Sequence, residues 1–264
     1  MNHPLATFRM NRQVIERVLP HDTLFMHGNL ASNRWWEPTV KALAARAGAA
    51  TGRAILAEWR GCGRSQPTFL QPEEFDLDTL ASDYLGLSEE LGAHPCDVVA
   101  HSTGCALALA AALRAPAAIR RLVLLDPIPA DGIEIDIEMR KHFVKMRADR
   151  DFCAAVLATT IKDVDTKGGF FQSLVDDASA IAPEIINGVP HMLSQMRMAE
   201  GLAGLQNRVL VIHGAEDTVL PKEGASRLAA LLPNARYQEI PDHGHSLNIE
   251  DPERFASLVL EFLA

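Results

Sequence analysis

Short runs of consecutive apolar residues alternate along this chain with longer stretches of helical character. Val, Ile and Leu dominate the short runs, as they do in strands that are buried on both faces of a sheet. The pattern predicts strands at residues 23–26, 54–58, 97–100, 121–125, 208–213 and 235–240. It predicts helices at residues 35–47, 77–91, 104–115, 222–232 and 252–263.

Strands that alternate with helices in this way predict an α/β fold, a mostly parallel, doubly wound sheet with helices on both faces. Residues 131–200 interrupt the alternation, because they contain no convincing strand and are mostly helical. Turn signals occur within them at 166–169, 182–183 and 187–190. We therefore expect a core formed by residues 1–130 and 201–264, with residues 131–200 inserted as a helical lid over the carboxyl ends of the strands.

Composition narrows the classes of partner. The sequence has 34 acidic and 25 basic residues. The resulting net charge of −9 argues against a nucleic-acid partner and against docking on anionic membranes. We see neither a secretory signal nor an apolar run of the about 20 residues that span a bilayer. Four scattered cysteines favour a reduced, cytoplasmic protein. The sequence predicts no oligomeric state.

The strongest chemical signal is the segment Ala100-His101-Ser102-Thr103-Gly104, between a predicted strand and a predicted helix. A serine among small residues at such a turn is typical of a nucleophile elbow, in which the hydroxyl is exposed to substrate. The free N–H groups at the start of the helix favour a developing anion. The alternative is an ordinary serine N-cap without any chemistry.

A serine nucleophile needs a base and an acid that orients the base. After the last predicted strand, His245 and His243 are the candidates for the base. Asp217 is the leading candidate for the acid, because it follows the strand 208–213 at the same edge of the sheet. Asp126 ends another strand at that edge and remains an alternative, and Glu216 is the weakest of the three.

The loop after the first predicted strand offers an oxyanion hole. Gly28 allows the backbone there to approach a ligand closely. The N–H groups of Asn29 and Thr103 are the predicted donors to a tetrahedral oxyanion. Each such donor stabilises a transition state by about 3 kcal/mol.

Taken together, the chain resembles the α/β-hydrolase superfamily. The resemblance covers residues 22–130 and 205–264, and the order Ser…Asp…His is that of the superfamily. It implies that His245 rather than His243 is the base, since a G-H pair followed by E-x-P is the arrangement in similar hydrolases. The motifs that carry it are H-G-N at 27–29, E-W-R-G-C-G-R-S at 58–65, A-H-S-T-G at 100–104, H-G-A-E-D at 213–217 and G-H-S-L-N-I-E-D-P at 244–252.

The resemblance implies a serine hydrolase that cleaves a small to medium apolar carboxylic ester through an acyl-enzyme, with no metal or organic cofactor. Similar triads also serve carbon–carbon bond hydrolases, lactonases and thioesterases, and a few similar proteins are cofactor-free dioxygenases. A ligand-binding protein on a hydrolase frame is a remote alternative. Residues predicted to line an apolar pocket are Trp35, Trp36, Phe143, Met146 and Phe171, although packing in the lid core would also explain the phenylalanines and the methionine.

Overall fold

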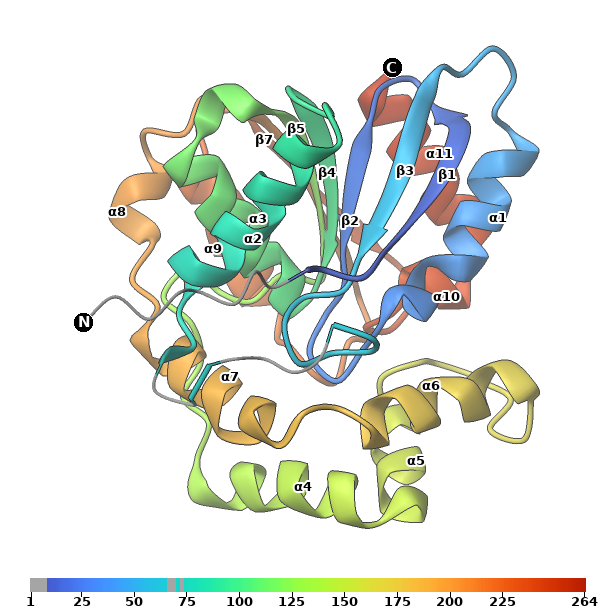
Figure 1. Ribbon diagram of the computed structural model, residues 1–264, viewed down its shortest axis with the longest axis vertical. Coiled ribbons are helices and arrows are strands. Elements are labelled where there is room, and N and C mark those ends of the chain that lie inside the picture. Colours follow the sequence, from blue (N-terminus) through green and yellow to red (C-terminus); the bar gives the residue numbers. More distant parts are fainter. Residues whose placement is uncertain (1–8, 66–69, 72–73) are drawn as a thin grey trace.

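The computed structural model describes residues 9–65, 70–71 and 74–264, and its centre is a seven-stranded sheet (Figure 1). The strand order is β1-β3-β2-β4-β5-β6-β7. β1 is antiparallel to β3, and the other neighbouring strands are parallel. This confirms the predicted fold class. The strands are β1 (Arg12–Leu19), β2 (Thr23–Met26), β3 (Gly52–Ala57), β4 (Cys96–His101), β5 (Ile119–Leu125), β6 (Arg208–Gly214) and β7 (Ala235–Ile240).

Helices cover both faces of the sheet. On one face lie α1 (Glu37–Ala45) and α11 (Pro252–Leu263), and on the other lie α2 (Leu77–Glu90), α3 (Thr103–Arg114) and α9 (Lys222–Leu231) (Figure 1). Shorter elements include the 3-10 helices Asn33–Trp36 and Pro116–Ala118 and helix α10 (Leu247–Glu250).

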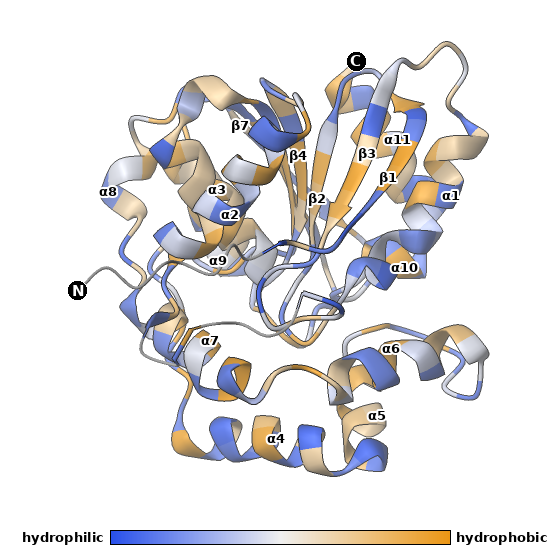
Figure 2. Ribbon diagram, viewed as in Figure 1, coloured by the Kyte–Doolittle hydropathy of each residue, from blue (hydrophilic) through white to orange (hydrophobic). Residues whose placement is uncertain are grey.

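The central strands are covered on both faces, which explains why their sequences are continuous apolar runs. Val98 of β4 packs with the α2–α3 side, whereas its neighbour Val99 packs with the α1–α11 side. Successive side chains of a strand point to opposite faces, so a strand covered on both faces is apolar at every position. The hydrophobic colouring of the interior strands in Figure 2 follows from this double burial.

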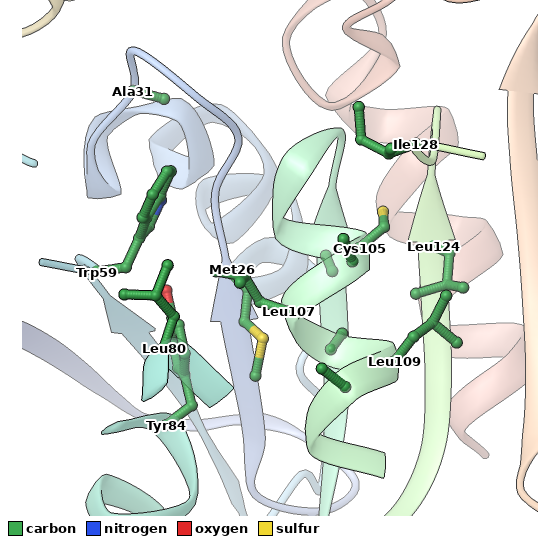
Figure 3. Packing of buried hydrophobic residues seen from close by; sticks show 14 of the residues in the cluster. Met26, Ala31, Trp59, Leu80, Tyr84, Cys105, Leu107, Leu109, Leu124 and Ile128 are labelled. Carbon is green, nitrogen blue, oxygen red and sulfur yellow. The ribbon is translucent and has the colours of Figure 1, made fainter. Parts of the chain in front are cut away.

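Helix α3 packs directly on the sheet. Leu107 and Leu109 of α3 are fully buried, and Figure 3 shows them beside Met26 of β2 and Leu124 of β5. The α3 sequence is mostly Ala and Leu and is buried along most of its length, so little polar surface separates it from the strands. This packing holds the N-terminus of α3 at the carboxyl edge of the sheet.

Between β5 and β6 the chain forms α4 (Ile137–Ala148), α5 (Arg150–Ala158), α6 (Gly169–Ser179), α7 (Pro183–Gln195) and α8 (Ala199–Leu202). We call residues 137–202 the helical segment. Figure 1 shows α4 to α7 below the carboxyl ends of the parallel strands. The helical content agrees with the expectation for residues 131–200, whereas their role as a lid remains a prediction.

Two elements differ from the sequence-based expectation. The edge strand β1 was not predicted, because polar residues interrupt its apolar positions and only Val18 and Leu19 are buried. The turn expected at 187–190 is wrong, since those residues lie inside α7 with Pro190 in the helix interior. The buried apolar face of α7, which includes Ile185, Val189 and Leu193, outweighs the local turn preference.

Among the described residues, none of the helices combines the length and apolar character needed to cross a membrane.

Candidate active site

Ser102 occupies a sharp turn between β4 and α3. Its backbone has φ 53° and ψ −122°, a left-handed φ that a side-chain-bearing residue rarely adopts. Gly104 makes the turn possible, because a Cβ on it would lie 2.4 Å from the Met26 carbonyl oxygen and 2.5 Å from that of His27. The local geometry is that of a nucleophile elbow, and strained backbone of this kind is common at active sites.

His245 and Asp217 come together at the same edge of the sheet. The imidazole Nδ1 lies 2.7 Å from Asp217 Oδ2, and both side chains are almost completely buried. The other oxygen of Asp217, Oδ1, accepts hydrogen bonds from the N–H groups of Val219 at 2.7 Å and Leu220 at 3.1 Å. These contacts fix the carboxylate and, through it, the orientation of the ring.

The surroundings of Asp217 favour its charged form. Burial alone would raise the pKa of this carboxyl, but the hydrogen bond and charge of His245, together with the two backbone N–H groups, hold the pKa below its ordinary value. A carboxylate here stabilises the imidazolium that forms when His245 takes up a proton.

The alternative residues have other partners. Glu216 is half-exposed and pairs with Lys162 at 2.9 Å. The ring of His243 has its Nδ1 2.9 Å from the Pro241 carbonyl oxygen. Asp126 is fully buried, and its Oδ1 accepts a hydrogen bond from the Gly214 N–H at 2.9 Å. Of the three carboxyl groups considered, Asp217 is the one hydrogen-bonded to His245.

Burial of Asp126, and then the nearby charge of Asp217, raise its pKa well above the ordinary value, although the Gly214 N–H acts in the opposite direction. Two carboxyl groups this close cannot both ionise at low cost. The surroundings therefore favour the charged form of Asp217 and the neutral form of Asp126.

His101 was assigned no role from the sequence, yet its side chain contacts the backbone of His245. Its Nε2 donates a hydrogen bond to the His245 backbone oxygen at 2.8 Å, and its ring stacks on Trp35. Burial, followed by the charge of His245, lowers the pKa of His101 to about 3, so the ring is neutral. The one sequence signal for this role was its position beside Ser102.

The loop after β2 lies directly against Ser102. A Cβ added to Gly28 would lie 3.1 Å from Ser102 Cβ. Trp59 Nε1 donates to His27 Nδ1 at 3.0 Å, which braces this loop from the neighbouring strand end. Asn29 Oδ1 accepts from the Leu30 N–H at 2.9 Å. Asn29 and Thr103 line one cavity with Ser102, and their part in an oxyanion hole remains a prediction.

That cavity has a volume of about 360 Å³ and lies between the sheet edge and the helical segment. Ser102 and His245 both line it, although neither the Ser102 hydroxyl nor His245 Nε2 forms a hydrogen bond within the described part of the chain. Such bonds are often long in ligand-free sites. Its described lining contains no Lys, Arg, Asp or Glu. Apolar residues that line it include Trp35, Ile128, Ile135, Phe143, Met146 and Leu157.

Two of the predicted pocket residues lie elsewhere. Trp36 is completely buried on the other face of the sheet, where it packs against Phe25 and Phe255. Phe171 of α6 is buried in the core of the helical segment and does not line the cavity. Two larger hollows, of about 570 and 650 Å³, lie beside α3 and contain neither Ser102 nor His245.

Two groups of side chains lie close enough to share a metal ion: His101, Asp126 and His245, and Asp126, His213 and Asp217. Several of their ligand atoms are already engaged by protein. Asp217 Oδ2 is hydrogen-bonded to His245, and Asp126 Oδ1 is hydrogen-bonded to the Gly214 N–H. His101 Nε2 is hydrogen-bonded to the backbone oxygen of His245. We therefore interpret these groups as an acid–base network rather than a metal site.

Comparison with known proteins agrees with this geometry. Residues 23–258 match the family model described as the alpha/beta hydrolase family, and the chain belongs to that family. It is 35% identical to a 2-hydroxymuconate semialdehyde hydrolase of Pseudomonas putida over 193 residues, which are 68% of this chain and 66% of the relative. The chain is accordingly an enzyme of the hydrolase class.

Solved structures show the same fold. An enol-lactonase from Burkholderia xenovorans superposes with a TM-score of 0.82 and 22% identity, over 96% of each chain. A thermophilic esterase from Thermogutta terrifontis superposes with a TM-score of 0.78 and 22% identity, over 98% of this chain and 95% of the esterase.

Proposed function

We propose that the protein is a serine hydrolase that cleaves small to medium apolar carboxylic esters through an acyl-enzyme. The observation that carries the proposal is the 2.7 Å hydrogen bond between His245 and Asp217 at an apolar cavity that Ser102 also lines. The side chains that we assign as nucleophile, base and orienting acid lie at the same edge of the sheet, which supports the proposal.

In the proposed reaction, Ser102 Oγ attacks the ester carbonyl while His245 Nε2 takes its proton. The N–H groups of Asn29 and Thr103 hold the oxyanion. His245 then gives the proton to the leaving alcohol and afterwards activates a water molecule, which releases the acid and frees Ser102. Asp217 keeps the ring in the required tautomer throughout. All of the groups involved belong to the chain or to its substrate, so the proposal needs no metal or organic cofactor.

The lining of the cavity supports an uncharged substrate. A carboxylate bound away from water needs a cationic partner, and the described lining contains no Lys or Arg. The apolar residues offer instead a surface for a hydrocarbon acyl or alkoxy group.

Carbon–carbon bond hydrolysis is the second candidate. The relative from Pseudomonas putida is named as the hydrolase of a muconate semialdehyde, a compound whose name contains no ester. The name denotes an organic acid, so this alternative predicts that carboxylate-bearing substrates react faster than neutral esters. Lactones and thioesters are further candidates for the same three residues.

The test combines active-site labelling with a substrate panel. A fluorophosphonate should modify Ser102, and p-nitrophenyl esters of short and medium acyl length should be hydrolysed. The Ser102→Ala variant should lose about four or more orders of magnitude in kcat. Folded protein that neither labels nor hydrolyses any ester would refute the proposal and favour a binding protein, whereas substantial turnover by Ser102→Ala would favour cofactor-free dioxygenase chemistry.

The proposed setting is the cytoplasm, with a small molecule as partner and neither nucleic acid nor membrane. The four cysteines are free and buried, which suits a reducing compartment. Localisation of a tagged protein in its own host would test this.

A further inference from the structure

Glu250, the last residue of α10, accepts hydrogen bonds from the backbone on both sides of His245, the proposed base. Its Oε2 accepts a hydrogen bond from the Gly244 N–H at 2.7 Å, and its Oε1 accepts one from the Ser246 N–H at 3.1 Å. These two residues flank His245 in the chain. One carboxylate therefore closes the loop that carries the imidazole.

The same carboxylate reaches the helical segment. Glu250 Oε1 also accepts a hydrogen bond from the N–H of Lys162, in the connection between α5 and α6, at 3.0 Å. Two further bonds join this connection to the His245 loop: Ser246 Oγ donates to the Thr160 oxygen at 2.7 Å, and Lys162 Nζ donates to the Asp242 oxygen at 2.8 Å. Figure 1 shows α10 at the end of the sheet that faces the helical segment.

From this arrangement we propose that Glu250 is a positioning residue, which holds the backbone of His245 in register with Asp217 and ties it to the helical segment. The inference rests on the proposed function, because it assigns His245 as the base. Glu250 acts on the reaction through the loop and touches no reacting atom.

Three backbone donors and no cation converge on this carboxylate in the described part of the chain, since the ammonium group of Lys162 pairs with Glu216. An amide in place of the carboxylate has a single acceptor oxygen. Its NH₂ group would face an N–H of Gly244, or those of Ser246 and Lys162, so at least one donor would lose its partner. A shift of the loop by about 1 Å is enough to reduce turnover about 100-fold.

The test compares Glu250→Gln with Glu253→Gln, a matched loss of one negative charge three residues further on. Glu253 is exposed and pairs with Arg46 at the surface, away from the cavity. We expect Glu250→Gln to lower kcat for p-nitrophenyl butyrate about 10- to 100-fold, with KM within about twofold, and to slow fluorophosphonate labelling of Ser102 by a similar factor. Glu253→Gln should behave as the parent protein.

A readout independent of turnover is the low-field proton resonance between His245 Nδ1 and Asp217. It should be sharp in the parent protein and should broaden or shift in Glu250→Gln. Should that variant fold poorly, Glu250→Asp gives the same test, because it keeps the charge and withdraws the oxygens by one methylene.

Parent-like kcat together with an unchanged resonance in a folded Glu250 variant would overturn the positioning role. Loss of thermal stability without any change in kcat or in the resonance would also overturn it, as would an equal effect of Glu253→Gln. Parent protein that neither labels nor hydrolyses esters would refute the proposed function instead, and the resonance would still report on Glu250.

Discussion

Two buried aspartates, Asp126 and Asp217, lie close together near the imidazole of His245, and their surroundings shift their pKa values in opposite directions. The hydrogen bond to His245 keeps Asp217 charged, whereas Asp126 has the neighbouring carboxylate and little compensation. Position along the chain allowed either to serve as the acid. The distinction depends on which one the imidazole faces.

We predict that Asp217→Asn lowers kcat about 10³- to 10⁴-fold with little change in KM, because the amide cannot stabilise the imidazolium or hold its tautomer. Asp126→Asn should change kcat by less than about fivefold, since burial favours the neutral form of this carboxyl and an amide can still accept the Gly214 N–H. Steady-state kinetics on one ester check both. A larger loss in Asp126→Asn than in Asp217→Asn would reverse the assignment of the acid.

A third aspartate, Asp97 of β4, lies at the opposite end of the strands. It is fully buried, and its carboxylate lies 3.8 Å from the guanidinium of Arg120. Burial raises its pKa to about 6, although the charges of Arg120 and Arg121 and a backbone hydrogen bond from Arg121 act in the opposite direction. The folded state therefore holds this proton more tightly than the unfolded chain does, so stability falls as pH rises from about 4 to about 6.

We predict that Asp97→Asn raises the melting temperature at neutral pH, because an amide avoids the cost of burying a charge. Below about pH 4 the advantage should vanish, since the carboxyl is then protonated in both states. Melting curves of the two proteins across this range provide the measurement. An advantage of equal size at acid and neutral pH would mean that ionisation of Asp97 is not its cause.

At the scale of elements, the contact between α3 and β2 determines where Ser102 sits. The start of α3 passes so close to the carbonyl groups of Met26 and His27 that position 104 has no room for a Cβ. Both obstacles are backbone atoms of the strand end, which cannot move aside as a flexible side chain would. The packing of α3 on β2 and the turn at Ser102 therefore depend on the same close contact at Gly104.

We predict that Gly104→Ala destabilises the protein by about 1–3 kcal/mol and lowers kcat, because α3 must move away from the strand. Gly86→Ala is the matched control. Gly86 lies in α2 with open space where its Cβ would be, so alanine there should stabilise the protein by about 0.5–1 kcal/mol. Urea unfolding and ester kinetics of both variants test this, and equal behaviour of the two would contradict the close contact.

At the scale of the whole molecule, the cavity exists because two parts of the chain face each other. Ser102 and His245 come from the loops of the sheet, whereas Phe143, Met146 and Leu157 come from α4 and α5 of the helical segment. The proposed function therefore predicts that the distance between the sheet edge and this segment sets substrate size, and no single motif encodes this distance.

We predict that Leu157→Trp shifts the preference towards shorter acyl chains, because a larger side chain occupies part of the 360 Å³ cavity. The ratio of kcat/KM for hexanoate to that for acetate should fall about tenfold. Ala155→Leu is the control, since Ala155 is exposed on the same helix and does not line the cavity. An unchanged ratio in Leu157→Trp would place the acyl group elsewhere.

Several features could be predicted from the sequence because they depend on local order. Apolar runs such as 121–125 identify strands that are buried on both faces, and the small residues around Ser102 identify the turn. The edge strand β1 escaped prediction because its outward positions are polar. Pro190 was interpreted as a turn because the buried face of α7, which overrides it, forms with residues distant in the chain.

The sequence by itself determined the fold class and the family, and it supplied the candidates for the three residues of the proposed triad, since the order of strands and motifs is a property of a linear chain. Tertiary structure alone decided that His245 pairs with Asp217, that Trp36 and Phe171 lie outside the cavity, and that Glu250 closes the loop around the base. The physical reason is that protonation, burial and hydrogen bonding depend on distances between groups that are far apart along the chain.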